Sequence, residues 1–247
     1  MKFQRFASAL TLATALGSLA IAQDDGIDLD ELFADDFEEQ STVSINDPLE
    51  PLNRAIFHFN DDVYKKLAKP LARTYAKIMP DRVERGISNA FVNIKFPSRF
   101  VSNVLQGRFG QASKETGKFV LNTTVGLGGV LRPSDNYENL QTTNEDIGQA
   151  FGRWGMGHGF YLVIPFMGPT SLRDVVGDYA DDAVEPLKTP WSQVDDDTLR
   201  LSLRVLEITN KMPALMELYD SMRRSSIDPY SSVRDAYAQR RARDVSK

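Results

Sequence analysis

Cysteine is absent from this 247-residue chain, and histidine occurs only at His58 and His158. Without cysteine the chain forms neither disulfides nor a reactive thiolate, so its stability must come from packing. A zinc site would depend on carboxylates and on two histidines that are distant in the sequence. We therefore expect no metal site and no cysteine-based catalysis.

Long hydrophobic runs are also missing after residue 22. A membrane-spanning helix needs roughly 18 or more predominantly apolar residues in succession. The longest apolar run, residues 160–167, is much shorter and contains Pro165. We expect no simple spanning helix, so any contact with a membrane must use another arrangement.

The N-terminal residues have the layout of a cleaved secretory signal. Lys2 and Arg5 precede an apolar stretch over 6–22, which ends in a small-x-small pattern at Ala22. The stretch is too short for a convincing membrane span, and we expect cleavage between Ala22 and Gln23. An uncleaved anchor helix is the alternative interpretation.

The net charge of −5 is unevenly distributed. Residues 24–50 hold eleven acidic and no basic side chains, and we interpret 23–46 as an acidic flexible tether. Residues 223–247 hold seven basic and three acidic side chains, which predicts a basic C-terminal helix at the end of a folded domain over 47–247. No basic stripe is interleaved with aromatic residues, so no nucleic-acid partner is expected.

Apolar residues recur every three or four positions through most of the folded part. The first series predicts an amphipathic helix that follows Asp47, a helix-capping residue, and is interrupted at Pro70. Its apolar stripe consists of Leu52, Ile56, Phe59, Val63, Leu67, Leu71, Tyr75 and Ile78. Further helices are predicted to begin near Pro80, Pro97, Gly107, Thr143, Thr170, Asp197 and Asp228. Since strand alternation is scarce, the fold class is predicted to be all-α.

Three glycines interrupt this helical pattern near the middle of the chain. Gly126, Gly128 and Gly129 end the regular structure, and we interpret them as a hinge.

Residues 152–169 are unlike the rest because they are glycine-rich, aromatic and nearly uncharged. Their composition is typical of neither a strand ladder nor a stable helix. Aromatic side chains that flank an apolar stretch are favoured at a lipid interface. A buried turn of the core is the other interpretation of these side chains. The membrane-interface interpretation assigns this role to Trp154, Phe160, Tyr161, Ile164 and Phe166.

Asparagines lie close to several of the predicted apolar stripes. Asparagine is a poor residue for a helix interior unless its amide has a partner. Caps or internal hydrogen bonds are one explanation. The other is an uncharged polar lining for a passage, formed by Asn53, Asn60, Asn89, Asn93 and Asn122.

Motifs that would support catalysis are missing. The sequence contains no G-x-S-x-G, H-E-x-x-H or G-x-x-x-x-G-K-[ST] pattern. His58 falls on the polar side of the first predicted helix, as a solvated side chain would. We expect neither an enzyme nor a bound cofactor.

Several motifs together, in their order along residues 46–240, resemble the MlaA/VacJ family. They are DPLEPLNR at 47–54, FHFN at 57–60, LQG at 105–107, FVLNTT at 119–124, GLGG at 126–129, GQ at 148–149, WGMGHGFYLVIPF at 154–166, GPTSLRD at 168–174 and DPY at 228–230.

The resemblance implies a ring-like bundle of short amphipathic helices embedded in one leaflet of the outer membrane, at its periplasmic face, with a polar central passage. It implies non-enzymatic intermembrane phospholipid transport, in which phospholipid mislocalised to the outer leaflet is removed. A soluble periplasmic lipid carrier would then deliver it to an ABC transporter of the inner membrane. Trimeric outer-membrane porins are the other partners that the resemblance implies.

The chain departs from the family at its start. Family members are typically lipoproteins anchored through a cysteine at the cleavage site, where this sequence has Ala22 and Gln23. We therefore expect the mature protein to hold the membrane without an attached lipid. A structural porin- or envelope-binding module is the rival function, and an envelope lipid hydrolase ranks third because its nucleophile motif is missing.

Overall fold

The structure, a computed structural model, describes residues 43–186 and 197–247. The predicted signal peptide 1–22, its cleavage site at Ala22 and Gln23, and most of the predicted tether lie outside the described residues. The chain divides into two compact units. Unit 1 comprises Met1–Met79, Phe160–Thr170 and Leu201–Gln239, and unit 2 comprises Pro80–Gly159, Ser171–Arg200 and Arg240–Lys247.

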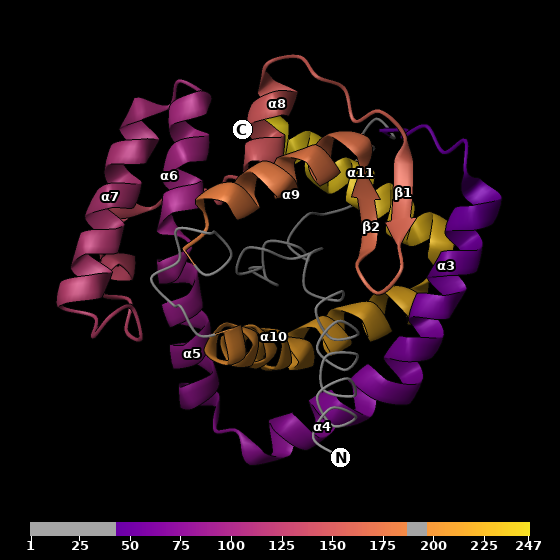
Figure 1. The fold of residues 1–247 in the computed structure, drawn as a ribbon, viewed down its shortest axis with the longest axis horizontal. Helices are drawn as coiled ribbons and strands as arrows, with labels where there is room; N and C mark the ends of the chain where they lie inside the picture. The colour runs from indigo at the N-terminus through magenta and orange to yellow at the C-terminus, as the bar shows by residue number, and fades with distance from the viewer. Residues whose placement is uncertain (1–42, 187–196) are drawn as a thin grey trace. The chain divides into compact units, whose positions relative to one another are not determined.

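Helices dominate the described residues (Figure 1), which confirms the predicted all-α fold class. Unit 1 contains α3 (Glu50–Val63), the π-helical turn η1 (Tyr64–Ala68), α4 (Lys69–Ile78), and parts of α10 (Asp197–Ser225) and α11 (Pro229–Ser246). Unit 2 contains α5 (Asp81–Ile94), α6 (Phe96–Leu105), α7 (Phe109–Thr124), the 3-10 turns η2 (Pro133–Asn136) and η3 (Glu138–Leu140), α8 (Ile147–Arg153) and α9 (Leu172–Val184). None of the described helices combines the length and apolar composition needed to cross a membrane.

The first helix is interrupted as predicted, but its start differs from the prediction. The π-helical turn precedes Pro70, which has no N–H to donate to the preceding turn. Asp47 does not cap the helix, because α3 begins at Glu50 and its N-cap, Leu49, makes no side-chain cap hydrogen bond. The Asp47 carboxylate instead accepts hydrogen bonds from the Asn53 amide, at 2.8 Å, and from the Tyr230 hydroxyl.

A short hairpin overturns the expectation that residues 152–169 form no strand. Strands β1 (Tyr161–Ile164) and β2 (Gly168–Ser171) pair with each other (Figure 1). The turn between them has positive φ at Phe166 (63°) and at Gly168 (84°). A positive φ is unusual for a phenylalanine, so its neighbours must hold the turn in place.

Two apolar clusters form the core of unit 1. In the first, Tyr64, Ala68 and Ala72 pack against α10 through Ile208 and Met212. The second joins the hairpin to α3 and α11 and consists of Ile45, Phe57, Tyr161, Val163, Tyr230 and Ala238.

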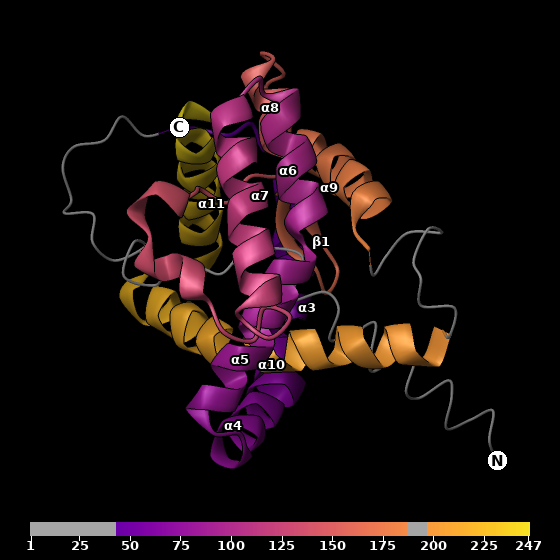
Figure 2. The ribbon, with the colours of Figure 1, turned by 90° about the vertical axis from the view of Figure 1, so that its left-hand side faces the viewer.

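Unit 2 is built by close approach of helices. Helices α6 and α7 lie side by side in both ribbon views (Figures 1 and 2). Helices α8 and α9 meet at two glycines, since a Cβ on Gly177 would lie 2.5 Å from the Cα of Gly148. Helix α8 begins at Ile147 and not near Thr143 as predicted, because Asp146 is its N-cap and accepts a hydrogen bond from the Gln149 N–H. Ser171 caps α9 in the same way.

Candidate functional site

Helix α9 in unit 2 has a buried polar side and an exposed apolar side. Its exposed side carries Leu172, Val176 and Tyr179, and Val176 is 51% and Tyr179 81% exposed. These three residues share one helical face because they are four and three positions apart. The residues on the buried side are Arg173, Asp174, Gly177 and Asp181. This is the reverse of a helix at the surface of a water-soluble domain.

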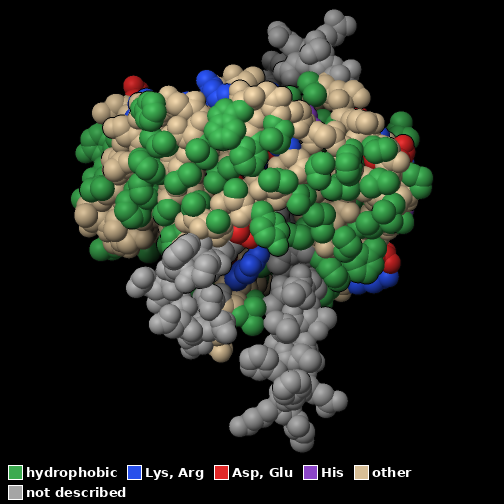
Figure 3. Space-filling model, turned by 45° about the horizontal axis from the view of Figure 1, so that its top comes forward, with side chains coloured by type: hydrophobic (Ala, Val, Ile, Leu, Met, Phe, Trp, Pro, Cys, Tyr) green, Lys and Arg blue, Asp and Glu red, His purple; other side chains and the backbone are tan. Residues whose placement is uncertain are grey.

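Helices α6 and α7 repeat the same reversal. The buried residues of α7 are Ala112, Glu115, Lys118 and Asn122, and those of α6 are Ser98, Arg99, Ser102 and Asn103. Phe109 and Val120 of α7, like Val104 and Leu105 of α6, are exposed. Hydrophobic side chains are spread widely over the face seen in Figure 3, and few charged side chains lie among them. The exposed apolar side chains on α6, α7 and α9 of unit 2 indicate an interaction surface.

Ion pairs hold the buried polar sides together. Arg241 contacts both oxygens of Asp146, at 2.5 and 3.0 Å, and both oxygens of Asp174, at 2.8 Å. Burial raises the pKa of Asp146, but Arg241 outweighs burial, so the pKa lies below its ordinary value. Arg99 donates to Glu115 at 3.1 Å. An unpaired charge at these depths would cost several kcal/mol, so the pairing is what permits a polar interior.

Two buried groups titrate away from their ordinary range. Asp181 accepts hydrogen bonds from the Ser98 hydroxyl and from the N–H of Ile147, neither of which is charged. Burial, followed by the nearby Asp146 carboxylate, raises the pKa of Asp181 to about 7. Burial also lowers the pKa of Lys118, whose ammonium donates to a threonine hydroxyl at 3.1 Å.

The three glycines predicted as a hinge lie in a tight turn after α7. Gly128 and Gly129 have φ values of 73° and 93°, a region that favours glycine. A Cβ on Gly129 would lie 2.4 Å from the Cβ of Asn93, and one on Gly126 would lie 2.3 Å from two backbone oxygens. The glycines therefore permit close packing. The exposed apolar side chains of this turn are Val125, Leu127, Val130 and Leu131.

The five asparagines predicted to line a passage are divided between the units. In unit 1, Asn53 is 1% exposed; its amide donates to the Tyr161 carbonyl at 3.1 Å and accepts from the Val163 N–H at 2.9 Å. The Asn60 amide bonds the next part of the hairpin in the same way. It donates a hydrogen bond to the Ile164 carbonyl at 3.0 Å and accepts one from the Phe166 N–H at 2.6 Å.

The other three asparagines bond within unit 2. Asn93 donates to Thr123 at 2.9 Å, and Asn122 accepts from the Ser134 N–H at 3.1 Å. Asn89, which is half-buried, donates to the Val130 carbonyl at 3.1 Å. All five amides thus make internal hydrogen bonds, the first of the two explanations that the sequence left open.

The five aromatic and apolar side chains assigned to a membrane interface have different surroundings. Tyr161 is completely buried and packs against Tyr230 and Tyr237 in the core of unit 1. Trp154 is exposed on unit 2, where its indole N–H donates to the Leu105 carbonyl at 3.0 Å. The remaining three, Phe160, Ile164 and Phe166, are half-buried.

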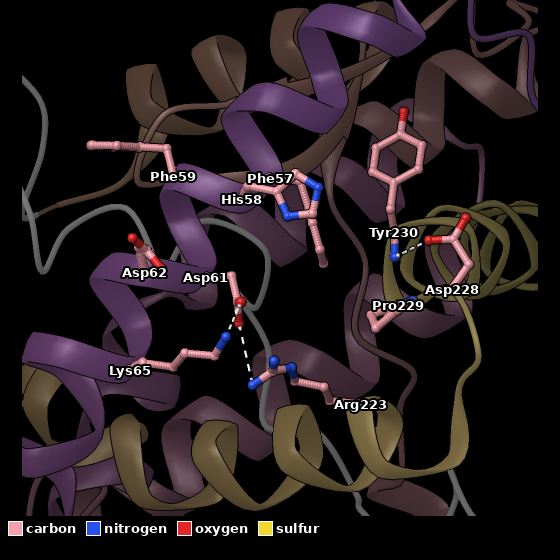
Figure 4. Close-up of a pocket in the computed structure, with 10 residues that line it drawn as sticks. All are labelled: Phe57, His58, Phe59, Asp61, Asp62, Lys65, Arg223, Asp228, Pro229 and Tyr230. Carbon is pink, nitrogen blue, oxygen red and sulfur yellow. Dashed lines mark hydrogen bonds and ion pairs between the residues drawn. The ribbon is translucent and has the colours of Figure 1, made fainter.

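Unit 1 also contains an open pocket of about 530 Å³ between α3 and the α10–α11 junction (Figure 4). Lys65 and Arg223 both reach Asp61, at 2.5 and 3.7 Å, and the Tyr219 hydroxyl donates to the same carboxylate at 3.0 Å. The other residues that line the pocket are Phe57, His58, Phe59, Asp62, Asp228, Pro229 and Tyr230.

No pattern in the sequence predicts this pocket. Asp61 and Lys65 have the spacing of an ordinary helical ion pair, and Arg223 belongs to a basic stretch, so no local pattern links them. Among residues 43–186 and 197–247, no group of three or more histidine or acidic side chains is arranged to hold a metal ion.

Comparison with known proteins identifies the family of this chain. A family model described as MlaA lipoprotein matches residues 45–244, most of the chain. The chain belongs to the MlaA lipoprotein family. The resemblance of its motifs to that family is thereby confirmed.

Two similar relatives are named intermembrane phospholipid transport system lipoprotein MlaA. The protein of Shigella flexneri is 33% identical over 198 residues, which are 79% of this chain and 76% of the relative. The protein of Escherichia coli (strain K12) is 32% identical over 199 residues, with the same coverage. A solved structure from work on the structural basis for maintenance of bacterial outer membrane lipid asymmetry is 30% identical. It has a TM-score of 0.70 and covers 81% of this chain and 99% of its own.

Proposed function

We propose that this protein is a non-enzymatic component of intermembrane phospholipid transport. In this role it removes phospholipid mislocalised to the outer leaflet of the outer membrane and passes it to a soluble periplasmic carrier. Membership in the MlaA family and the names of its relatives support the general role. The observation that carries the proposal is the reversal of α9, α7 and α6, whose apolar sides are exposed while their polar sides are buried.

The reversed helices suit a protein surrounded by lipid. Removing apolar surface from water is worth about 25 cal/mol per Å², so exposed Val176 and Tyr179 favour contact with acyl chains. Helices too polar to cross a bilayer can still lie within one leaflet. The buried polar sides, in turn, offer a headgroup an environment in which charge is tolerated. We propose that the helices form a ring in one leaflet around such a polar passage.

Individual residues take the following places in this proposal. Trp154, with its exposed ring and bonded indole, lies at the lipid boundary, and half-buried Phe160, Ile164 and Phe166 lie near it. Of the asparagines, half-buried Asn89 is the best suited to contribute to a passage wall. The glycine turn at 126–129 is proposed to bend when lipid passes. Trimeric porins and a periplasmic carrier of an ABC-transporter system are the proposed partners.

Transport is tested in a deletion strain by measuring phospholipid in the outer leaflet. We expect phospholipid to accumulate there in the deletion strain and to return to the parental level when the wild-type chain is restored. Unchanged outer-leaflet phospholipid together with weakened porin association would overturn transport. It would support the structural porin-binding module instead.

A further inference from the structure

The pocket of unit 1 contains two cations that share one carboxylate. Asp61 is buried and accepts hydrogen bonds from Lys65 and from the Tyr219 hydroxyl, while Arg223 lies 3.7 Å from it. In the close-up view, the Lys65 and Arg223 side chains converge on this carboxylate from two different helices (Figure 4). Asp61 therefore positions both cations at the pocket wall.

The remaining carboxylates of the pocket already have cations of their own. Asp228 receives two bonds from Arg54, at 3.2 and 2.8 Å, and Asp62 pairs with Lys66 at 2.6 Å. Within the part of the chain that the structure describes, Arg223 makes only the long ion pair with Asp61. A guanidinium has five N–H donors and an ammonium three, so Arg223 and Lys65 retain donors for an anion.

Apolar side chains complete the pocket. Phe57 and Pro229 line it near the cations, whereas Phe59, which also lines it, points away from Lys65 and Arg223 (Figure 4). Phe59 is exposed and belongs to the same stripe of α3 as Leu52, which is also exposed. The volume of the pocket, about 530 Å³, is within the range of small-molecule sites. A ligand that joins a phosphate to apolar groups meets complementary surfaces here.

We propose that this pocket binds the phosphate of a phospholipid headgroup through Arg223 and Lys65, with the apolar part of the lipid against Phe57 and Pro229. The planar fork of Arg223 suits two phosphate oxygens, and Lys65 adds a point charge. Asp61 acts as a positioning residue for both. The inference rests on the proposed transport function and assigns one binding site for its substrate class.

Binding is tested with the purified full-length chain in phosphate-free detergent. Soluble dihexanoyl phosphatidylglycerol is titrated and followed by ³¹P nuclear magnetic resonance. We expect saturable binding that Arg223→Gln and Lys65→Gln each weaken about tenfold or more, since each removes a charged hydrogen bond. Arg224→Gln, a neighbouring arginine outside the pocket, is the matched control and should bind as the wild type does. Circular dichroism checks that each variant is folded; Arg223 is 39% exposed, so its replacement should be tolerated.

Two competitors distinguish the source of the phosphate. Dihexanoylglycerol, which lacks phosphate, should not displace the lipid, and inorganic phosphate should displace it only at a much higher concentration. Equally effective displacement by inorganic phosphate would assign the pocket to the free ion and overturn the lipid proposal. Wild-type affinity in both pocket variants would overturn the site altogether.

The same variants in the deletion strain separate this inference from the proposed function. If the wild-type chain restores outer-leaflet phospholipid to the parental level while the pocket variants bind lipid normally, only the pocket assignment fails. If the wild-type chain does not restore it, the transport proposal fails whatever the binding result.

Discussion

Asn53 and Asn60 act as hydrogen-bonding partners for the edge of the hairpin. Each amide bonds one backbone carbonyl and one backbone N–H two residues apart, as a neighbouring strand would. Seven residues of α-helix rise about 10.5 Å, and three residues of strand span about 10 Å. The spacing of the two asparagines therefore matches the distance from Tyr161 to Ile164 along β1.

Replacing Asn53 should destabilise the protein. In Asn53→Leu the Tyr161 carbonyl and the Val163 N–H lose their buried partner, at a cost of about 1–3 kcal/mol each. We expect a clear fall in the melting temperature measured by circular dichroism. Asn136→Leu is the control, because this exposed side chain donates a long hydrogen bond of 3.4 Å to the Pro133 carbonyl. Equal melting temperatures for the two variants would contradict the role of Asn53.

Asp181 makes stability depend on pH. Its pKa is about 7 in the folded protein and 3.8 in a free side chain, so the folded state retains a proton that the unfolded state has lost. Stability should therefore fall as pH rises from about 4 to 7, by roughly 4 kcal/mol for a shift of this size.

The variant Asp181→Asn cannot lose a proton, so its stability should change less over this pH range. We expect it to exceed the wild type in urea unfolding at pH 8 and to lose that advantage near pH 4. If the two proteins show parallel stability profiles between pH 4 and 8, the folded pKa of Asp181 is not raised.

Helix α9 is the element on which the membrane argument depends most. A charge placed at Val176 would enter the apolar environment proposed for this face, at about 2.5–3.5 kcal/mol if it lies deep. We expect Val176→Asp to reduce retention in the outer-membrane fraction while circular dichroism remains normal. The control is Ile227→Asp, because Ile227 is fully exposed in unit 1 and directly precedes the charged Asp228. Retention of both variants would show that α9 does not contact lipid.

Helix boundaries were largely predictable because they depend on local chemistry. Pro80 precedes α5, Pro97 lies in the first turn of α6, and Asp228 precedes α11. The hairpin was missed because β1 is completed by side chains of α3 that are distant in the sequence. Such a partner leaves no periodic signal in residues 161–164.

The sequence pattern predicts which residues form each apolar stripe, but it does not predict whether the stripe is buried or exposed. Periodicity places Leu172, Val176 and Tyr179 on one face of α9, yet it does not reveal whether that face is buried. The decision depends on long-range ion pairs such as Arg241 with Asp146, which hold the polar side inside. The pairing of the two pocket cations was not predictable for the same reason, because Arg223 and Lys65 come together at Asp61 only in the folded chain.

At the scale of the whole molecule, the proposed apolar surface should hold the protein in the membrane without the acidic segment. Residues 24–46 are rich in carboxylates, which anionic headgroups repel. We expect a chain that lacks 24–46 but keeps its signal sequence to remain in the outer-membrane fraction. Its release into the soluble periplasm would identify that segment as the anchor.

The central claim is that the exposed apolar faces of the reversed helices contact lipid. Because the chain has no cysteine, single cysteines can carry spin labels without other changes. The measurement compares collisions with oxygen, which is enriched in lipid, against a water-soluble nickel chelate, in the membrane-reconstituted protein. At Val176→Cys and Val120→Cys we predict high oxygen and low nickel accessibility, and at Ile227→Cys the opposite. Nickel accessibility at Val176 and Val120 as high as at Ile227 would contradict the account.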